Sequence, residues 1–156
     1  MEALRRERIR EFFIFNFWKT KVKRLYKSKG NTFSGFLLTS LGWAKYLGLD
    51  RSTVEEYLKS FGISEEELRL AWDMSEEKVI QPSEAKLERF VNITLSAVSY
   101  VQERGKVPRQ ELRVKVFKNL SWLTDLVMGY LEKEGVVRSY FEAKGKGKIK
   151  LYTFGG

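Results

Sequence analysis

Residues 119–154 read NLSWLTDLVMGYLEKEGVVRSYFEAKGKGKIKLYTF, and this stretch decides the fold of the second half of the chain. Apolar residues recur at helical spacing over 121–131, which predicts an amphipathic helix. Ser121 is the expected N-cap of this helix, and Gly135 is expected to end it.

Two strands are predicted after this helix. The runs at 136–141 and 148–154 are rich in Val, Tyr, Phe and Ile, as strands are. The loop between them, at 144–148, reads KGKGK and supplies the glycines that a tight hairpin turn needs. The sequence therefore predicts a two-stranded β-hairpin with a lysine at every other position of its loop.

Two further helices are predicted upstream of residue 119. The stretch 83–104 carries its apolar residues on one face, as a long amphipathic helix does. A second helix is expected over 109–118, with Pro108 at its first position, where the missing N–H costs nothing. Three helices followed by a hairpin thus make up a predicted domain at 83–156.

The first half of the chain reads as a separate helical bundle at 1–74. Residues 75–82 are the expected linker because they lack a clear periodicity and contain Pro82. The fold class expected is therefore mainly α, with the hairpin confined to the second domain. The predicted helices of the bundle lie at 2–28, from Asn31 or Thr32 to 47, from Ser52 or Thr53 to 60, and at 64–73.

Composition limits the possible functions. The 156 residues include 29 Lys and Arg against 20 Asp and Glu, a formal charge of +9. Such an excess indicates a polyanionic partner, because neutralised phosphates release counterions; the charged surface of a thermophilic protein is the alternative. The absence of Cys and His excludes disulfides and most hydrolase and metalloenzyme designs. The chain is also poor in Asn and Gln and rich in Glu, Lys and Arg, a bias that suits an archaeal thermophile.

The charge is segregated along the chain. Residues 1–30 contain ten Lys and Arg and three Glu, whereas residues 31–80 contain five basic and nine acidic side chains. Residues 138–156 are again basic, with five Lys and Arg against one Glu. Segregation of this kind favours a specific basic face over uniform solubilisation.

The second domain resembles a winged helix-turn-helix. The likeness spans 84–154 and is carried by the phrase LEKEGVV at 131–137, which is similar to the end of that family's third helix and the start of its wing, and by Tyr152-Thr153-Phe154 as the closing strand. The resemblance implies that the third helix enters the major groove of DNA and that the hairpin, or wing, grips the flanking backbone.

The third helix departs from the pattern expected of a base reader. Trp122, Asp125, Leu126 and Gly129 are predicted to face outward. No Arg is present to bind guanine and no Asn or Gln to pair with adenine. We therefore expect backbone contacts with little sequence preference rather than recognition of an operator.

Residues expected to contact the DNA backbone flank the third helix. Basic side chains position a protein on phosphates without reading bases; on the hairpin they could instead keep an exposed edge soluble. Trp122 and Leu126 could alternatively form a protein-binding or dimer surface. The predicted DNA-binding residues of this domain are Arg109, Arg113, Lys115, Lys118, Ser121, Trp122, Lys144, Lys146 and Lys148.

Residues 29–60 bear a weaker resemblance to the helical domain that lies C-terminal to archaeal and plasmid primase cores. The run KGNTF at 29–33, an apolar helix, a glycine turn and an acidic short helix carry it. The resemblance implies contact with template DNA and the initiating nucleotide. The same helix start, with Lys27, Lys29, Asn31 and Thr32, could bind a phosphate or be an ordinary N-cap.

Aromatic residues interleave with basic ones in the first helix, around Phe12–Trp18. They could stack on single-stranded bases or lie on an anionic membrane, but core packing is the interpretation that we favour. The most apolar stretch is too short to span a membrane, and no signal peptide is visible.

The sequence therefore predicts a cytoplasmic, non-catalytic DNA-binding accessory protein of replication or priming, without a cofactor or metal. A winged-helix transcription regulator and a protein-interaction module are the alternatives. The expected partner is DNA, single- or double-stranded, with a protein partner or homodimer also open.

Overall fold

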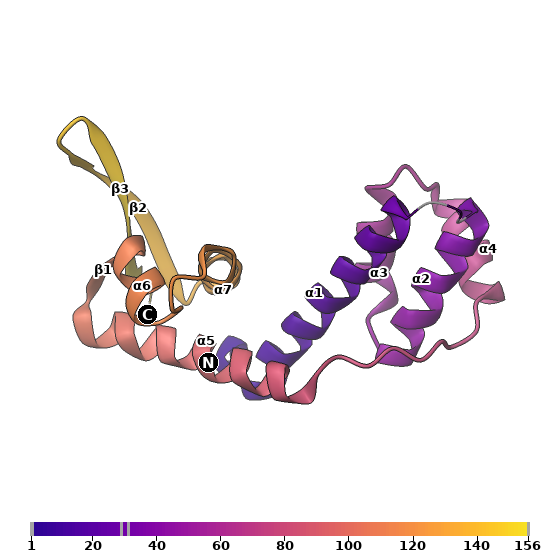
Figure 1. Cartoon of the computed structure of the whole chain (residues 1–156), viewed down its shortest axis with the longest axis horizontal. Coiled ribbons are helices and arrows are strands. Elements are labelled where there is room, and N and C mark those ends of the chain that lie inside the picture. The colour runs from indigo at the N-terminus through magenta and orange to yellow at the C-terminus, as the bar shows by residue number, and fades with distance from the viewer. Residues whose placement is uncertain (1, 29, 31, 156) are drawn as a thin grey trace. The chain divides into compact units, whose positions relative to one another are not determined.

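The computed structural model describes residues 2–28, 30 and 32–155. It is mainly helical, as predicted, with one antiparallel sheet near the C-terminus (Figure 1). The chain divides into two compact units, one formed by Glu11–Glu84 and the other by Met1–Arg10 together with Ala85–Gly156. Among the described residues, no helix combines the length and the apolar character that crossing a membrane requires.

The helical unit is built from four helices, and the predicted order of helices is confirmed. Local signals set their ends: Thr32 caps the second helix and Gly48 ends it with a φ of 70°. Ser64 and Glu67 form the predicted capping box. The helices are α1 (Arg6–Lys27), α2 (Phe33–Leu47), α3 (Arg51–Lys59) and α4 (Glu65–Met74).

The predicted start of α3 was wrong by two residues. Its N-cap is Asp50, not Ser52 or Thr53, because the Asp50 carboxylate accepts hydrogen bonds from the Thr53 backbone N–H at 3.1 Å and from its hydroxyl at 2.9 Å. A carboxylate at this position also faces the positive end of the helix.

The core of the helical unit gathers around Trp18. This indole is fully buried and donates a hydrogen bond to the Ser40 carbonyl at 2.9 Å. Phe13 is also buried, and Phe15 stacks on Trp18 at 5.7 Å between ring centroids. These aromatic side chains of α1 are thus core residues, as the sequence favoured, rather than a surface for stacking bases.

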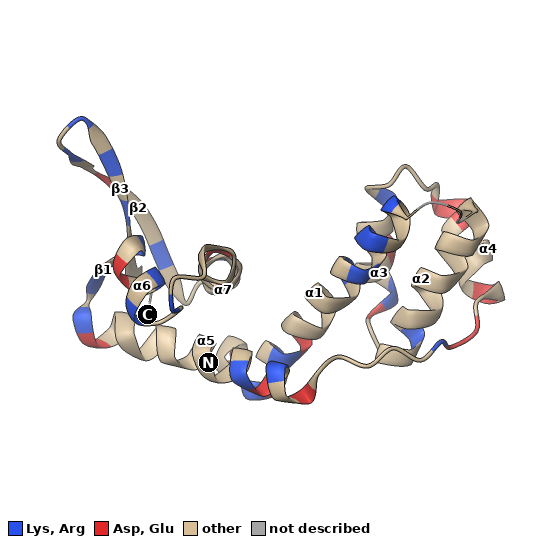
Figure 2. Cartoon of the chain, viewed as in Figure 1, with Lys and Arg blue, Asp and Glu red and all other residues tan. Residues whose placement is uncertain are grey.

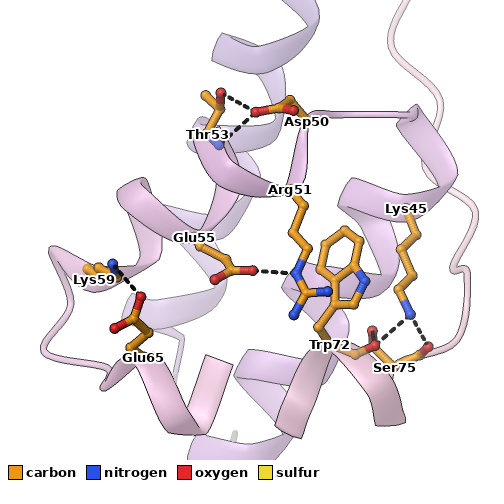
Figure 3. A network of polar contacts seen from close by, with 9 residues as sticks. All are labelled: Lys45, Asp50, Arg51, Thr53, Glu55, Lys59, Glu65, Trp72 and Ser75. Carbon is orange, nitrogen blue, oxygen red and sulfur yellow. Dashed lines mark hydrogen bonds and ion pairs between the residues drawn. The ribbon is translucent and has the colours of Figure 1, made fainter. Parts of the chain in front are cut away.

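The segment after α4 lies on α2 through specific contacts. Lys45 donates from Nζ to the carbonyls of Trp72 and Ser75 at 2.6 and 2.7 Å (Figure 3). The Lys78 backbone N–H donates to the Gly42 carbonyl at 3.0 Å. A Cβ at Gly42 would lie 2.5 Å from the Glu76 carbonyl oxygen, so only glycine permits this approach.

The C-terminal unit is built from three helices and three strands. Leu87, Val91, Thr94, Val98 and Val101 of the first helix are buried, so the apolar face predicted for it is confirmed. The elements are α5 (Glu84–Arg104), β1 (Lys106–Pro108), α6 (Arg109–Lys115), α7 (Ser121–Lys133), β2 (Val137–Lys144) and β3 (Gly147–Phe154).

The hairpin of β2 and β3 is confirmed, but the sheet has a third strand that the sequence did not indicate. Its order is β1-β3-β2, with both pairs antiparallel. Val107 pairs with Tyr152 at one side of β3, and Ser139 pairs with the same residue at the other. Pro108 therefore ends a strand and caps α6 instead of occupying the first position of that helix.

The turn between α6 and α7 also differs from the prediction. The second helix ends at Lys115 rather than at Lys118, because Lys118 and Asn119 adopt left-handed backbone conformations with φ of 50° and 68°. Leu120 is the N-cap of α7 and makes no side-chain capping bond. Ser121 is thus the first helical residue and not the cap.

The first residues of the chain pack with the C-terminal unit. A short 3-10 helix (Glu2–Leu4) precedes α1, and Tyr130 donates its hydroxyl to the Ala3 carbonyl at 2.8 Å. Arg6 binds the Asn92 side chain at 3.0 Å, and Arg8 binds Glu134 at 3.4 Å. Residues from α5 and α7 therefore hold the start of the chain.

Candidate nucleic-acid interface

The hairpin carries a group of three lysines at its tip, which we call the tip lysines: Lys144, Lys146 and Lys148. The turn consists of Gly145 and Lys146, and Gly145 has a φ of 61°, which permits a two-residue loop. All three side chains are exposed. Among the residues that the structure describes, no carboxylate oxygen lies within 4.0 Å of their Nζ atoms. Figure 2 shows this end of the hairpin as basic.

The two faces of the hairpin differ in charge balance. Paired residues of an antiparallel ladder lie on the same face, and neighbours along a strand lie on opposite faces. The Tyr140 face holds Tyr140, Glu142 and Leu151, together with the basic residues Arg138 and Lys144. Here the Lys106 Nζ lies 2.9 Å from Glu142 and 5.9 Å from the Tyr140 ring. The acid of this face is therefore neutralised by a lysine of β1.

The opposite face, which we call the Phe141 face, holds Phe141, Ala143, Lys148 and Lys150. No acidic residue of β2 or β3 lies on it. The Phe141 ring is 65% exposed although it lies in the middle of a strand. Lys150, its cross-strand partner, places Nζ 6.0 Å from the Phe141 ring centroid and 5.4 Å from that of Tyr152.

Arg109, predicted to contact DNA, is occupied by Asp125. Its Nε and one terminal nitrogen bind the two carboxylate oxygens at 2.8 and 3.0 Å, a bidentate pair. The hydrogen bond from Arg109 holds the pKa of the Asp125 carboxyl below its usual range, and the charge of Lys150 acts in the same direction. The charge of the Arg109 guanidinium is therefore largely neutralised within the protein and is less available to a phosphate.

The other basic residues predicted on α6 are less constrained. Arg113 bonds to the neutral side chains of Gln110 and Asn119 at 3.1 and 3.3 Å and so keeps its charge available. Lys115 and Lys118 are exposed. Within the described ranges, neither lysine has a carboxylate oxygen within 4.0 Å.

The outward face of α7 is as predicted. Trp122 is 57% exposed, and its ring meets Phe90 edge-on at 6.2 Å. Asp125 and Gly129 are exposed, and Leu126 is half-buried. Ser121 is exposed at the start of the helix. With Leu120, which is 42% exposed, Trp122 forms an apolar surface rather than a set of donors for base edges.

The helix start proposed as a phosphate site can be described only in part. Lys29 and Asn31 lie outside the described residues. Lys27 is exposed. The Thr32 hydroxyl accepts a hydrogen bond from the Gly35 backbone N–H at 3.0 Å, as in an ordinary N-cap.

A second basic surface lies at the C-terminal end of α1, where the sequence predicts a basic helix but identifies only Lys27 as a contact residue. Lys23, Arg24 and Lys27 are exposed, and no carboxylate oxygen of the described residues lies within 4.0 Å of their charged groups. Tyr26, on the same helix, is 54% exposed. The signal was present in the sequence, because residues 12–49 contain no Asp or Glu.

The described residues contain no group of three or more His, Cys, Asp or Glu side chains placed to hold a metal ion. Comparison with known protein families, with curated proteins and with solved structures finds no match to this chain.

Proposed function

We propose that the C-terminal unit binds the phosphate backbone of nucleic acid through the tip lysines, with little sequence preference. The observation that carries the proposal is the group of three exposed ammonium groups at the end of the hairpin, none of which is paired with a carboxylate of the described residues. Backbone contacts of this kind give affinity that does not depend on sequence and falls steeply with salt.

Solubility alone is a weaker explanation for the tip lysines. A soluble surface needs charges of both signs interspersed, and the acid of the hairpin, Glu142, is already bound to Lys106. The remaining charge is therefore all of one sign, which favours an anionic ligand.

The face of α7 supports low specificity. Its outward side chains offer an indole, a carboxylate and a glycine, none of which is a common reader of base edges in the major groove. A dimeric transcription regulator that reads an operator is therefore the less favoured alternative. Resemblance to the winged-helix family supports the same general role and adds no specific site.

We further propose that this role is non-catalytic and belongs to DNA replication or priming. Only the resemblance of residues 29–60 to the helical domain of archaeal primases supports the choice of process. A preference for single-stranded over double-stranded DNA would agree with priming, and a footprint at one defined promoter would contradict it.

The experiment is fluorescence-anisotropy binding to random-sequence single- and double-stranded DNA across a salt series. Replacing the tip lysines with Ala should weaken binding and reduce the slope of log K against log salt. Each lost phosphate contact lowers that slope by about 0.9 on duplex DNA. The matched control replaces the exposed Arg69, Lys78 and Arg89 with Ala, which removes the same charge elsewhere.

If neither the tip-lysine variant nor the control loses affinity, the hairpin is not the interface. An equal loss in both variants would show that only net charge matters.

A second candidate function rests on Trp122. Its exposed ring, next to Leu120, fits a protein partner or a second copy of the chain. Trp122→Ala should then dissociate a dimer, which light scattering would detect as a lower molar mass, and should leave DNA affinity unchanged. A monomeric wild-type chain that loses DNA affinity on this substitution would instead place the indole in the nucleic-acid interface.

A further inference from the structure

We propose that the Phe141 face is a stacking platform for an unpaired nucleobase, so that the hairpin binds single-stranded nucleic acid in preference to duplex. This inference rests on the proposed function and names its substrate class. It starts from the placement of Phe141, whose ring is 65% exposed in a strand whose pairing with β3 is complete around it.

Burying the Phe141 ring against another aromatic face would be favourable, because it removes apolar surface from water. The Lys150 Nζ lies over the ring, 6.0 Å from its centroid, and the other neighbours on the Phe141 face cover it little. Ala143 is small, and Ser139, the next residue of β2 on that face, is bonded to Glu132. The side chains around the ring therefore leave room for a flat ligand.

The charges around the ring identify that ligand. Lys148 lies diagonally across the ladder from Phe141, and Lys150 lies directly opposite it. An aromatic ring flanked by cations matches a nucleotide, in which a base with a π-face is joined to a phosphate. Lys146, in the turn, extends the positive charge along the direction that a strand of phosphates would follow.

Only an unpaired base can use such a ring. In a duplex the faces of the bases are covered by their neighbours, whereas in a single strand they are free to stack on aromatic side chains. The tip lysines can contact phosphates of either form. Phe141 is therefore the residue that distinguishes single strands from duplexes.

The same strand supplies a matched control. Tyr140 is the neighbouring aromatic residue, is 38% exposed and lies on the opposite face. There Lys106 is bound to Glu142 beside the ring, and the tip lysine of that face, Lys144, lies four residues along β2 from Tyr140, at the turn. Tyr140→Ala removes an aromatic ring from the same hairpin without touching the proposed platform.

The test compares Phe141→Ala, Phe141→Leu, Phe141→Trp and Tyr140→Ala in the full chain, with single-stranded and duplex DNA oligonucleotides of random sequence and single-stranded RNA as probes. Stacking of one base predicts a loss of roughly 5- to 100-fold for Phe141→Ala on single strands. Duplex affinity and the salt slope should stay unchanged, because the ring carries no charge. Phe141→Trp should bind at least as tightly as the wild type, and Phe141→Leu should be as weak as Phe141→Ala.

Other results would overturn the platform. Equal losses on single strands and duplexes, wild-type binding by Phe141→Leu, or a loss as large for Tyr140→Ala would each do so. A changed oligomeric state with unchanged nucleic-acid affinity would assign the face to a second copy of the chain. If Phe141→Ala has no effect while the tip-lysine variant is weakened, the platform fails and the proposed function stands. If the tip-lysine variant is also unaffected, both fail.

Discussion

Asp125 shows how a single residue changes the role of another. The sequence places Arg109 among the phosphate contacts, but the bidentate pair with Asp125 removes its charge from the surface. Sequence could not reveal this pair, because the two residues lie in different helices and meet only when α6 and α7 pack. The tip lysines were predictable because lysines and glycines alternate in a short hairpin loop, where the lysine side chains have no core to enter.

Asp125→Asn should therefore strengthen DNA binding. The substitution frees the Arg109 guanidinium and removes one negative charge from α7, so the salt slope on duplex DNA should steepen by about one phosphate contact. Asp73→Asn makes the same charge change on the exposed surface of α4 and serves as the control. Equal gains in the two variants would contradict a specific release of Arg109.

The same pair should contribute to stability above acidic pH only. Folding lowers the pKa of Asp125, so its contribution is complete above the unfolded value of about 3.9 and is lost as pH falls through the folded value. Because the Asp125 side chain is 63% exposed, solvent screening limits the contribution to at most about 1 kcal/mol. The difference in urea unfolding between wild type and Asp125→Asn should be present at neutral pH and shrink as the pH falls below the unfolded value. A difference that persists in acid would assign the effect to packing.

At the scale of elements, two glycines inside helices have opposite roles. A Cβ at Gly42 of α2 would collide with the Glu76 carbonyl, whereas a Cβ at Gly129 of α7 would meet no atom within 4 Å. Gly42 therefore permits residues 75–78 to lie against α2. Gly129 has no such partner within the described structure.

Alanine substitutions should separate these roles in thermal or urea unfolding. Gly42→Ala should destabilise the chain by about 1–3 kcal/mol, because the segment after α4 must move away. Gly129→Ala should stabilise it by roughly 0.5–1 kcal/mol, because alanine favours the helix. If Gly42→Ala stabilises the chain as Gly129→Ala does, the Glu76 carbonyl does not pack tightly against α2.

Local signals made most of the helices predictable, and long-range pairing explains what was missed. The capping box at Ser64 and the turn at Gly48 act within a few residues of the chain. The strand β1 spans three residues and forms only because Val107 pairs with Tyr152, which lies far along the chain. No periodicity can develop over three residues, so this strand had no sequence signature.

At the scale of the whole molecule, each of the two units carries a group of exposed basic side chains: the tip lysines in one and the end of α1 in the other. The sequence showed the concentration, since its first thirty residues and its last nineteen are both basic. It did not show which of these side chains remain unpaired, because ion pairs such as Arg6–Glu88 join distant parts of the chain.

Replacing Lys23, Arg24 and Lys27 with Ala should test whether the helical unit also contacts nucleic acid. These side chains are exposed and unpaired with any described carboxylate. On long random-sequence DNA we expect a further reduction of the salt slope, by up to about three contacts, beyond that of the tip-lysine variant. A combined variant whose slope equals that of the tip-lysine variant alone would restrict binding to the C-terminal unit.

The contact between Ala3 and Tyr130 has a consequence for how the chain is made. A ribosome releases residues 2–10 first, yet their binding sites on α5 and α7 are synthesised last. Residues 2–10 therefore lack these contacts until synthesis has passed Glu134. A fragment that begins at residue 83 would lack these contacts, so the cloning boundary decides whether the hairpin-bearing unit keeps them.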